Sequence, residues 1–188
     1  MSDLLGRGFF DDEVIKWAFP DPARRAKSLS EFFGIYLDLA FDRGGVMVDA
    51  DRAAAFVYFR PEGMDMSVEE QERMRSRMTA CAGEDASTVL AFLDALDAHH
   101  PTGPRHYYGF CMATEPERRN SGCGMAFMQF LNTVMDRDGL PSYSECTSLQ
   151  CRSICIRLGY RDAGPPIQLE GGPVLYPVWR EPNAQVVC

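Results

Sequence analysis

A strand–helix–strand pattern between residues 106 and 146 restricts the fold of this chain more than any other feature. Residues 106–114 (HYYGFCMAT) have the aromatic and apolar character of a strand, and residues 143–146 form a second, shorter one. Between them, residues 122–138 carry two apolar rows at helical spacing, which predicts a helix that is buried on most sides. A helix that connects two strands allows them to lie parallel in one sheet, so we expect an α/β protein.

The remaining segments predict a mixed sheet with flanking helices in one domain of residues 1–188. No stretch rich in Gly, Ser or Pro divides the chain, so no domain boundary is expected. The N-terminal third is mostly helical, and Ser28-Leu-Ser-Glu31 has the pattern of a capping box at a helix start. Further helices are expected at 9–19, 67–81, 86–99 and 149–158, and strands at 46–48, 53–59, 160–169 and 173–180.

Composition and charge exclude several classes of protein. The 188 residues are 46% hydrophobic and 24% charged, without an apolar run near the roughly 20 residues of a membrane span. Residues 1–10 lack the apolar region of a signal peptide, so we expect a cytoplasmic protein with no membrane partner. The net charge of −8 argues against a nucleic-acid surface and favours cationic small substrates.

The cysteines are expected to be reduced, because their number is odd and no secretion signal precedes them. Most cysteines of this kind are small apolar core residues, and a metal or redox site is the alternative. The spacing contains no CxxC pair, so the sequence predicts no bound metal. The seven cysteines are Cys81, Cys111, Cys123, Cys146, Cys151, Cys155 and Cys188.

The segment from Arg119 to Gly124 is the most informative for function, because it joins the strand to the long helix. A turn with glycines at a helix start offers unpaired backbone N–H groups and the positive end of the helix dipole, which suit a pyrophosphate. The spacing fits neither GxxxxGK[ST] nor GxGxxG. A plain structural turn is therefore the alternative to a phosphate-binding loop.

Arg119-x-x-Gly122-x-Gly124 resembles the R/Q-x-x-G-x-G/A acyl-CoA loop of the GNAT acetyltransferase superfamily. Residues 141–148 and 157–160 resemble the next strand of that family and its helix ending in L-G-F/Y. Residues 10–22 and 172–182 resemble the first helix and last strand of GNAT members similar to puromycin N-acetyltransferase. The resemblance covers most of residues 9–182, and its co-linear motifs are more specific together than any one of them.

The resemblance implies a GNAT fold, in which a mixed central sheet is splayed at a wedge for acetyl-CoA between residues 106–114 and 142–146. It implies that pantetheine binds main-chain groups of Met112 and Thr114, and that a main-chain N–H near Met112 or Ala113 stabilises the oxyanion. The residues assigned to the acyl-CoA site in this way are Met112, Ala113, Thr114, Arg119, Asn120, Ser121, Gly122, Cys123, Gly124, Met125 and Cys151.

Three departures from the family pattern concern the site and the sheet. Ser121 stands where the family often has a basic residue, so phosphate binding relies more on backbone dipoles and arginines. Cys151 and Cys155 replace an Asn and a Tyr, and that Tyr usually protonates the departing thiolate. The strand that normally precedes the first helix is missing, so either the sheet lacks an edge strand or the start of the sequence is late.

Three residues are candidates for chemistry, each with an ordinary alternative. Glu145 ends the short strand beside the wedge and is the first choice for general base. Its alternative role is an ionised residue in the wall of the site that attracts a cationic amine. His106 is the next candidate, although a hydrogen-bonded His is more common. Cys155 could act as a weak acid or be a spectator thiol. The helical N-terminal third is expected to form the acceptor pocket, walled by aromatic residues that could equally be core: Trp17, Phe33 and Tyr36.

The function expected is an acetyl-CoA-dependent N-acetyltransferase, in which a small-molecule amine such as an antibiotic or a biosynthetic intermediate attacks the thioester directly. One alternative is a GNAT-fold protein that binds coenzyme A without catalysis, and another is a GNAT fold that performs different chemistry because of Cys151 and Cys155. The partners expected are the amine and, at most, a second copy of the chain as a homodimer.

Overall fold

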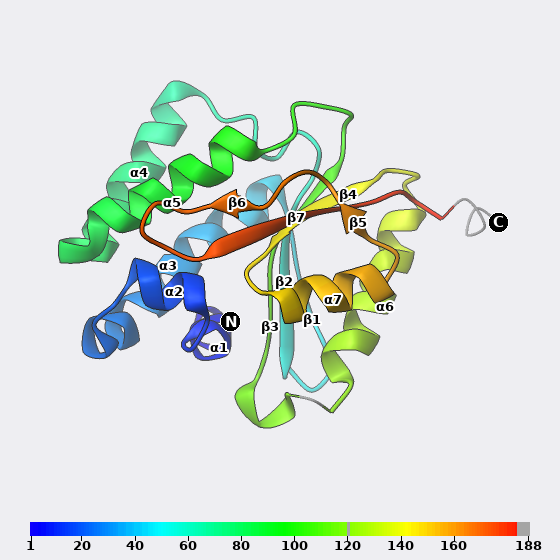
Figure 1. The fold of residues 1–188 in the computed structure, drawn as a ribbon, viewed down its shortest axis with the longest axis horizontal. Helices are drawn as coiled ribbons and strands as arrows, with labels where there is room; N and C mark the ends of the chain where they lie inside the picture. The colour runs from blue at the N-terminus through cyan, green and yellow to red at the C-terminus, as the bar shows by residue number, and fades with distance from the viewer. Residues whose placement is uncertain (120, 184–188) are drawn as a thin grey trace.

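The computed structural model describes residues 1–119 and 121–183 and consists of one mixed β-sheet between two sets of helices (Figure 1). The sheet has the order β1-β2-β3-β4-β7-β5, and β6 also pairs with β7. Among the strands of the described residues, β3 and β4 are the one parallel pair, and the other neighbours are antiparallel. The strands are β1 (Gly44–Val48), β2 (Ala54–Phe59), β3 (Tyr107–Thr114), β4 (Ser142–Cys146), β5 (Arg161–Asp162), β6 (Ile167–Gln168) and β7 (Val174–Arg180).

The helices cover both faces of the sheet. Helices α1 to α5 build the larger apolar cluster with one face, and α6 and α7 pack in smaller clusters on the other. Of the helices in the described residues, none is both long and apolar enough to cross a bilayer. The α-helices are α1 (Ser2–Phe9), α2 (Glu13–Ala18), α3 (Pro22–Arg43), α4 (Val68–Ala82), α5 (Ala86–His99), α6 (Cys123–Asp136) and α7 (Leu149–Arg157), with short 3-10 turns at Gly83–Asp85 and Pro116–Arg118.

Helix starts follow local capping chemistry, in one case at a different residue from the one predicted. Ser67 and Glu70 form the expected capping box of α4. The box predicted at Ser28 is wrong, because α3 already starts at Pro22, where the Asp21 side chain accepts the Arg24 N–H at 2.8 Å. Proline is well placed in the first turn of a helix, since the N–H it lacks has no partner there.

Three other expectations differ from the structure. Of the helix predicted at 9–19, residues 13–18 form α2, and a separate helix, α1, precedes it. Residues 160–169 contain only the short strands β5 and β6 instead of one long strand. Helix α6 is not buried on most sides, because Phe130 is 57% exposed. Its second apolar row is therefore divided, because Phe127 is buried while Phe130 is exposed to solvent.

The sheet splays between β3 and β4, as the family resemblance predicted. These two strands pair only through Tyr107 with Ser142 and Tyr108 with Tyr143. Beyond those pairs, the Ser144 hydroxyl donates to the Gly109 carbonyl at 2.6 Å, and no further ladder pair joins the strands in the described residues. The carboxyl halves of β3 and β4 therefore border an opening in the sheet, which we call the wedge.

A β-bulge lies on β3 at the point where the wedge begins. Val57 of β2 pairs with Cys111, and the next residue, Tyr58, pairs with Gly109, so Phe110 is an extra residue in β3. Phe110 and Cys111 consequently pack against the same apolar cluster although they are neighbours in sequence. The bulge therefore shifts the alternation of side chains between the two faces of β3 beside the wedge.

Candidate active site

The start of α6 has the features of an anion-binding loop. Gly122 adopts a left-handed conformation with φ of 83°, and no side chain caps α6 from that position. The Ser121 hydroxyl accepts the Cys123 N–H at 3.3 Å. A Cβ added at Gly124 would lie 3.1 Å from Thr114 Oγ1, so the helix start packs closely against the end of β3. The first turn therefore presents its backbone beside the wedge.

The charged residues near this loop already have protein partners. Arg119 donates to the Gly8 carbonyl at 2.6 Å, and Arg118 pairs with Asp51 at 3.0 Å. Cys123 Sγ lies 3.9 Å from a carboxylate oxygen of Asp49. Asn120 lies outside the described residues. The loop thus offers main-chain N–H groups more directly than the arginine side chains that were expected to assist them.

The β3 residues assigned to the acyl-CoA site lie along the wedge edge of their strand. Met112 packs with the α6 cluster, whereas Ala113 is buried in the larger cluster on the other face. Both pair with β2, through Phe56 and Ala55. The bulge at Phe110, close to the predicted oxyanion N–H, was not foreseen from the sequence, because a bulge depends on the register between two strands.

Glu145 lies on β4 with its carboxyl group turned toward the N-terminal helices. The Tyr108 hydroxyl donates to Glu145 Oε2 at 2.9 Å, while Oε1 is buried without a hydrogen-bond partner in the described part of the chain. Burial raises the pKa of Glu145 to about 7, although the hydroxyls of Tyr108 and Tyr143 favour the ionised form. The Tyr143 hydroxyl adjoins the carboxyl without a regular hydrogen bond.

Glu145 lines a cavity of about 50 Å³ that we call the aromatic cavity. Its walls are mainly apolar, and its polar lining consists of Glu145, Asp12, Thr147 and the Tyr108 hydroxyl. The aromatic rings that line it come from α1, α3, α5 and β3: Phe9, Phe32, Phe33, Phe92, Tyr108 and Phe110. The N-terminal helices therefore wall this cavity, and its use as the acceptor pocket stays a prediction.

Asp12 is a lining residue that sequence reasoning missed. Its carboxylate caps α2 by accepting the N–H groups of Val14 at 2.9 Å and Ile15 at 3.3 Å, and it accepts the Thr147 hydroxyl at 2.5 Å. Burial raises the pKa of Asp12. The sequence signal was an Asp before a short helix, which indicates a cap but not that the cap lies beside β4.

His106 lies apart from the aromatic cavity in the described structure. Its Nδ1 donates to the Pro104 carbonyl at 2.7 Å, and its Nε2 lies 3.2 Å from Nε2 of His100. Burial lowers the pKa of His100 to about 4, and His106 adds to this effect. These contacts favour the alternative stated for His106, a buried hydrogen-bonded side chain.

The three N-terminal aromatic candidates have different positions. Phe33 lines the aromatic cavity, and Tyr36 lines a neighbouring cavity of about 80 Å³ that also includes Tyr108 and Phe110. Trp17 instead packs against Gly172, where an added Cβ would lie 2.5 Å from the indole ring. One of the three therefore belongs to the cavity that contains Glu145.

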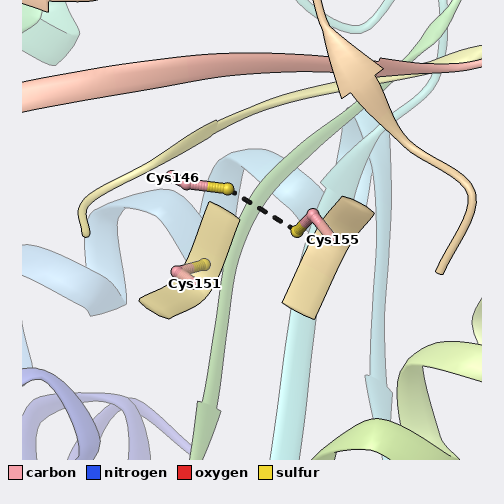
Figure 2. Close-up of side chains that lie close together, drawn as sticks. All are labelled: Cys146, Cys151 and Cys155. Atoms are coloured by element: carbon pink, nitrogen blue, oxygen red, sulfur yellow. Dashed lines mark hydrogen bonds between the residues drawn. The ribbon is translucent and has the colours of Figure 1, made fainter. Parts of the chain in front are cut away.

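Two of the cysteines proposed for the site, Cys151 and Cys155, form a cluster with Cys146 at the end of β4 and in α7 (Figure 2). The Sγ atoms of Cys146, Cys151 and Cys155 lie within 4.8 Å of one another. The premise that these spacings provide no chelating group is wrong, because residues 151 and 155 share a helix face that β4 approaches. Cys155 is buried, and its Sγ accepts the Cys146 thiol at 3.5 Å.

An open mixed sheet that splays between two parallel strands, with a glycine loop at the start of the helix joining them, is the fold of GNAT acetyltransferases. A structure described as histone acetyltransferase HPA2 and related acetyltransferase, from Corynebacterium glutamicum, matches with a TM-score of 0.66 and 21% identity, over 96% of this chain and 88% of its own. Arylalkylamine N-acetyltransferase 2 from Aedes aegypti matches with a TM-score of 0.58 and 11% identity, over 97% and 93%.

An agmatine N-acetyltransferase matches with a TM-score of 0.53 and 17% identity, over 90% of this chain and 87% of its own. No protein-family model and no curated protein sequence matches the chain. The chain therefore has the GNAT fold, and the narrower likeness to puromycin N-acetyltransferase stays a prediction.

Proposed function

We propose that this protein is an N-acetyltransferase that transfers the acetyl group of acetyl-CoA to a small amine with an apolar or aromatic body. One observation carries the proposal: a buried carboxylate oxygen of Glu145 without a partner faces the aromatic cavity beside the wedge. An unpartnered buried carboxylate is costly in a fold, so its persistence is explained if a substrate provides the missing donor.

The start of α6 fits the pyrophosphate of coenzyme A. Gly122 provides the left-handed turn, and the close packing of Gly124 on Thr114 keeps side-chain atoms out of the loop. Main-chain N–H groups at Gly124 and Met125 would hold the phosphates with the helix dipole, and main-chain groups of β3 would hold the pantetheine. When bound, acetyl-CoA supplies a thioester-activated acetyl group.

Glu145 is proposed as the base that accepts a proton from the amine. An alkyl ammonium must lose a proton before its nitrogen can attack, and a carboxylate with a pKa near 7 can accept that proton at neutral pH. Tyr108 holds Oε2 at 2.9 Å and leaves Oε1 for the amine. Tyr108 therefore positions the carboxyl group.

The bulge at Phe110 is proposed to supply the oxyanion contact. A bulge frees main-chain groups of its strand from the ladder, and this one lies where β3 leaves β4. A main-chain N–H held in place there would stabilise the oxygen of the tetrahedral intermediate. The Cys155 thiol is enclosed with Cys146, so we assign it no role as the acid for the departing thiol.

The acceptor class follows from the lining of the aromatic cavity. Glu145 and Asp12 provide carboxyl groups, while the rest of the lining is mostly apolar. An amine carried on an aromatic or alkyl body would match both features, whereas a polyamine or a peptide would leave charged groups against apolar walls. The cavity is small, so a compact acceptor such as 2-phenylethylamine is the best first substrate.

The test is the release of free coenzyme A from acetyl-CoA with 2-phenylethylamine, agmatine and an unblocked peptide as acceptors. The proposal predicts the highest kcat/KM for 2-phenylethylamine and a loss of turnover in Glu145→Gln with coenzyme A binding retained. Tight coenzyme A binding without turnover of any amine would support the alternative, a GNAT-fold protein that binds the cofactor without catalysis. The matched control is Glu170→Gln, an exposed glutamate beyond β6.

A further inference from the structure

Three thiols that the proposed reaction does not use lie together where β4 ends and α7 begins. Figure 2 shows Cys146 on β4 facing Cys155 on α7, with Cys151 one helical turn before Cys155. Cys146 and Cys155 are buried, whereas Cys151 is exposed on α7. Since all three sulfur atoms lie within 4.8 Å of one another, the thiol of the most exposed residue in the cluster lies directly beside two enclosed thiols.

The position of Cys151 favours its thiolate. It is the third residue of α7, where the Ser148 hydroxyl accepts its N–H at 3.1 Å and the positive end of the helix dipole is close. The neighbouring thiols of Cys146 and Cys155 lower the pKa of Cys151. Thiolates at such positions are the nucleophiles of thiol–disulfide exchange.

The two enclosed thiols differ in whether they can form a disulfide with Cys151. Residues four apart on a helix have Cβ atoms about 5–6 Å apart. A disulfide needs a Cβ separation of about 3.8 Å, so a bond between Cys151 and Cys155 would distort α7. Cys146 lies on a different element, so its approach to Cys151 does not require α7 to change. Cys146 is therefore the better resolving thiol.

We propose that Cys151 is a site of thiolation by a low-molecular-weight disulfide and that Cys146 then displaces the adduct to form an intramolecular disulfide. In the first step the Cys151 thiolate attacks one sulfur of RS–SR, a protein–S–S–R bond forms, and RS⁻ leaves and takes a proton from water. In the second step Cys146 loses its proton to solvent and attacks Cys151 Sγ, which releases the second RS⁻, protonated in turn to RSH.

The electrons balance over the two steps, because two protein thiols are oxidised while one small disulfide is reduced to two thiols. The burial of Cys146 protects it from direct attack, so the adduct is expected first at Cys151. This inference goes beyond the proposed acetyl transfer and depends only on the thiol chemistry of the three residues.

The test uses the reduced full-length chain and cystamine, a small cationic disulfide suited to a protein with a net charge of −8. After an acid quench, remaining thiols are alkylated and the protein is digested with trypsin. Cleavage after Arg137, Arg152 and Arg157 places Cys146 and Cys151 in peptide 138–152 and Cys155 in peptide 153–157. A Cys146–Cys151 disulfide therefore leaves one peptide, unalkylated and lighter by two hydrogen atoms than its reduced form.

The proposal predicts a Cys146–Cys151 disulfide in the wild type. In Cys146→Ala it predicts a stable cystamine adduct on Cys151. That adduct should form more than about tenfold faster than any adduct on Cys123, the half-buried control thiol. Cys151→Ser should give neither product, while Cys155→Ser should still give the disulfide.

Three results would overturn the proposal. The first is a wild-type disulfide that links peptides 138–152 and 153–157. The second is reaction at Cys123 as fast as at Cys151. The third is purified protein that holds an equivalent of zinc by elemental analysis and loses it in Cys151→Ser, because the thiols would then be metal ligands. The wild-type peptide map decides the pairing even if a variant fails to fold.

Discussion

Replacing Glu145 by Gln should lower activity and raise stability at the same time. The substitution keeps the shape of the side chain and an oxygen that can accept the Tyr108 hydroxyl, and it removes the ionisable group. Loss of a general base typically costs about 10²–10⁴-fold in rate. We therefore expect kcat to fall by more than about a hundredfold while coenzyme A affinity stays unchanged.

The stability gain follows from the pKa of Glu145, which burial raises from 4.5 to about 7. Because the folded state then binds the Glu145 proton more tightly than the unfolded state, the contribution of Glu145 to stability is largest at low pH and is lost as the pH rises from 4.5 to 7. At about 1.4 kcal/mol for each pKa unit, Glu145→Gln should be more stable than wild type by up to about 3 kcal/mol at pH 8. At pH 5 the difference from this source should fall below about 1 kcal/mol.

Two measurements check this prediction. Urea denaturation at pH 5 and pH 8 gives the free energy of unfolding of both proteins, and the pH dependence of kcat/KM for the wild type should show an acid limb near pH 7. A stability difference that is the same at both pH values would refute the argument from burial. Activity of Glu145→Gln near the wild-type level would refute its role as base, whatever the stability.

Other substitutions test the loop, the thiol and the core. Gly124→Glu should abolish calorimetric binding of coenzyme A by adding bulk beside Thr114 and a negative charge at the phosphate site, whereas Gly164→Glu, where a Cβ meets open space, should bind normally. Cys155→Ala should change kcat by less than about tenfold. Loss of turnover with intact coenzyme A binding would instead show that the Cys155 thiol takes part in the reaction. Asp136→Ala should lower the free energy of unfolding by about 3 kcal/mol or more in thermal melts, because the buried Arg180 guanidinium loses its two hydrogen bonds of 2.7 Å to the Asp136 carboxylate. A smaller loss would indicate that solvent reaches the Arg180 guanidinium in the variant.

The secondary structure was predicted best where a local signal sets it. The Ser67 capping box and the left-handed Gly159 after α7 mark their helix ends as expected. The segment 160–169 was predicted as one strand antiparallel to 173–180, yet in the structure two short pieces of it, β5 and β6, pair with β7. Sheet pairing is a tertiary property, so apolar content alone could not define it.

The candidate site divides in the same way. Glu145 could be found because alternation along a short strand and the position of a family motif both indicate it. Asp12 and the Phe110 bulge could not, since the first depends on a helix packing against β4 and the second on strand register. The cysteine cluster was missed because spacing rules for metal sites consider pairs along the chain, whereas Cys146 approaches Cys151 and Cys155 from another element.

The parallel pairing of β3 and β4 has a mechanical consequence. In the described part of the chain two residue pairs join these strands, so the sheet consists of two half-sheets, β1–β3 and β4–β7, that are held together along a short seam. Each half has its own ladders, and few main-chain hydrogen bonds resist separation at the open end of the seam. A molecule that bridges the seam would tie the halves together, so amide protons on Cys111 to Thr114 and Glu145 to Thr147 should exchange more slowly when coenzyme A is bound, while those of β1 should change little.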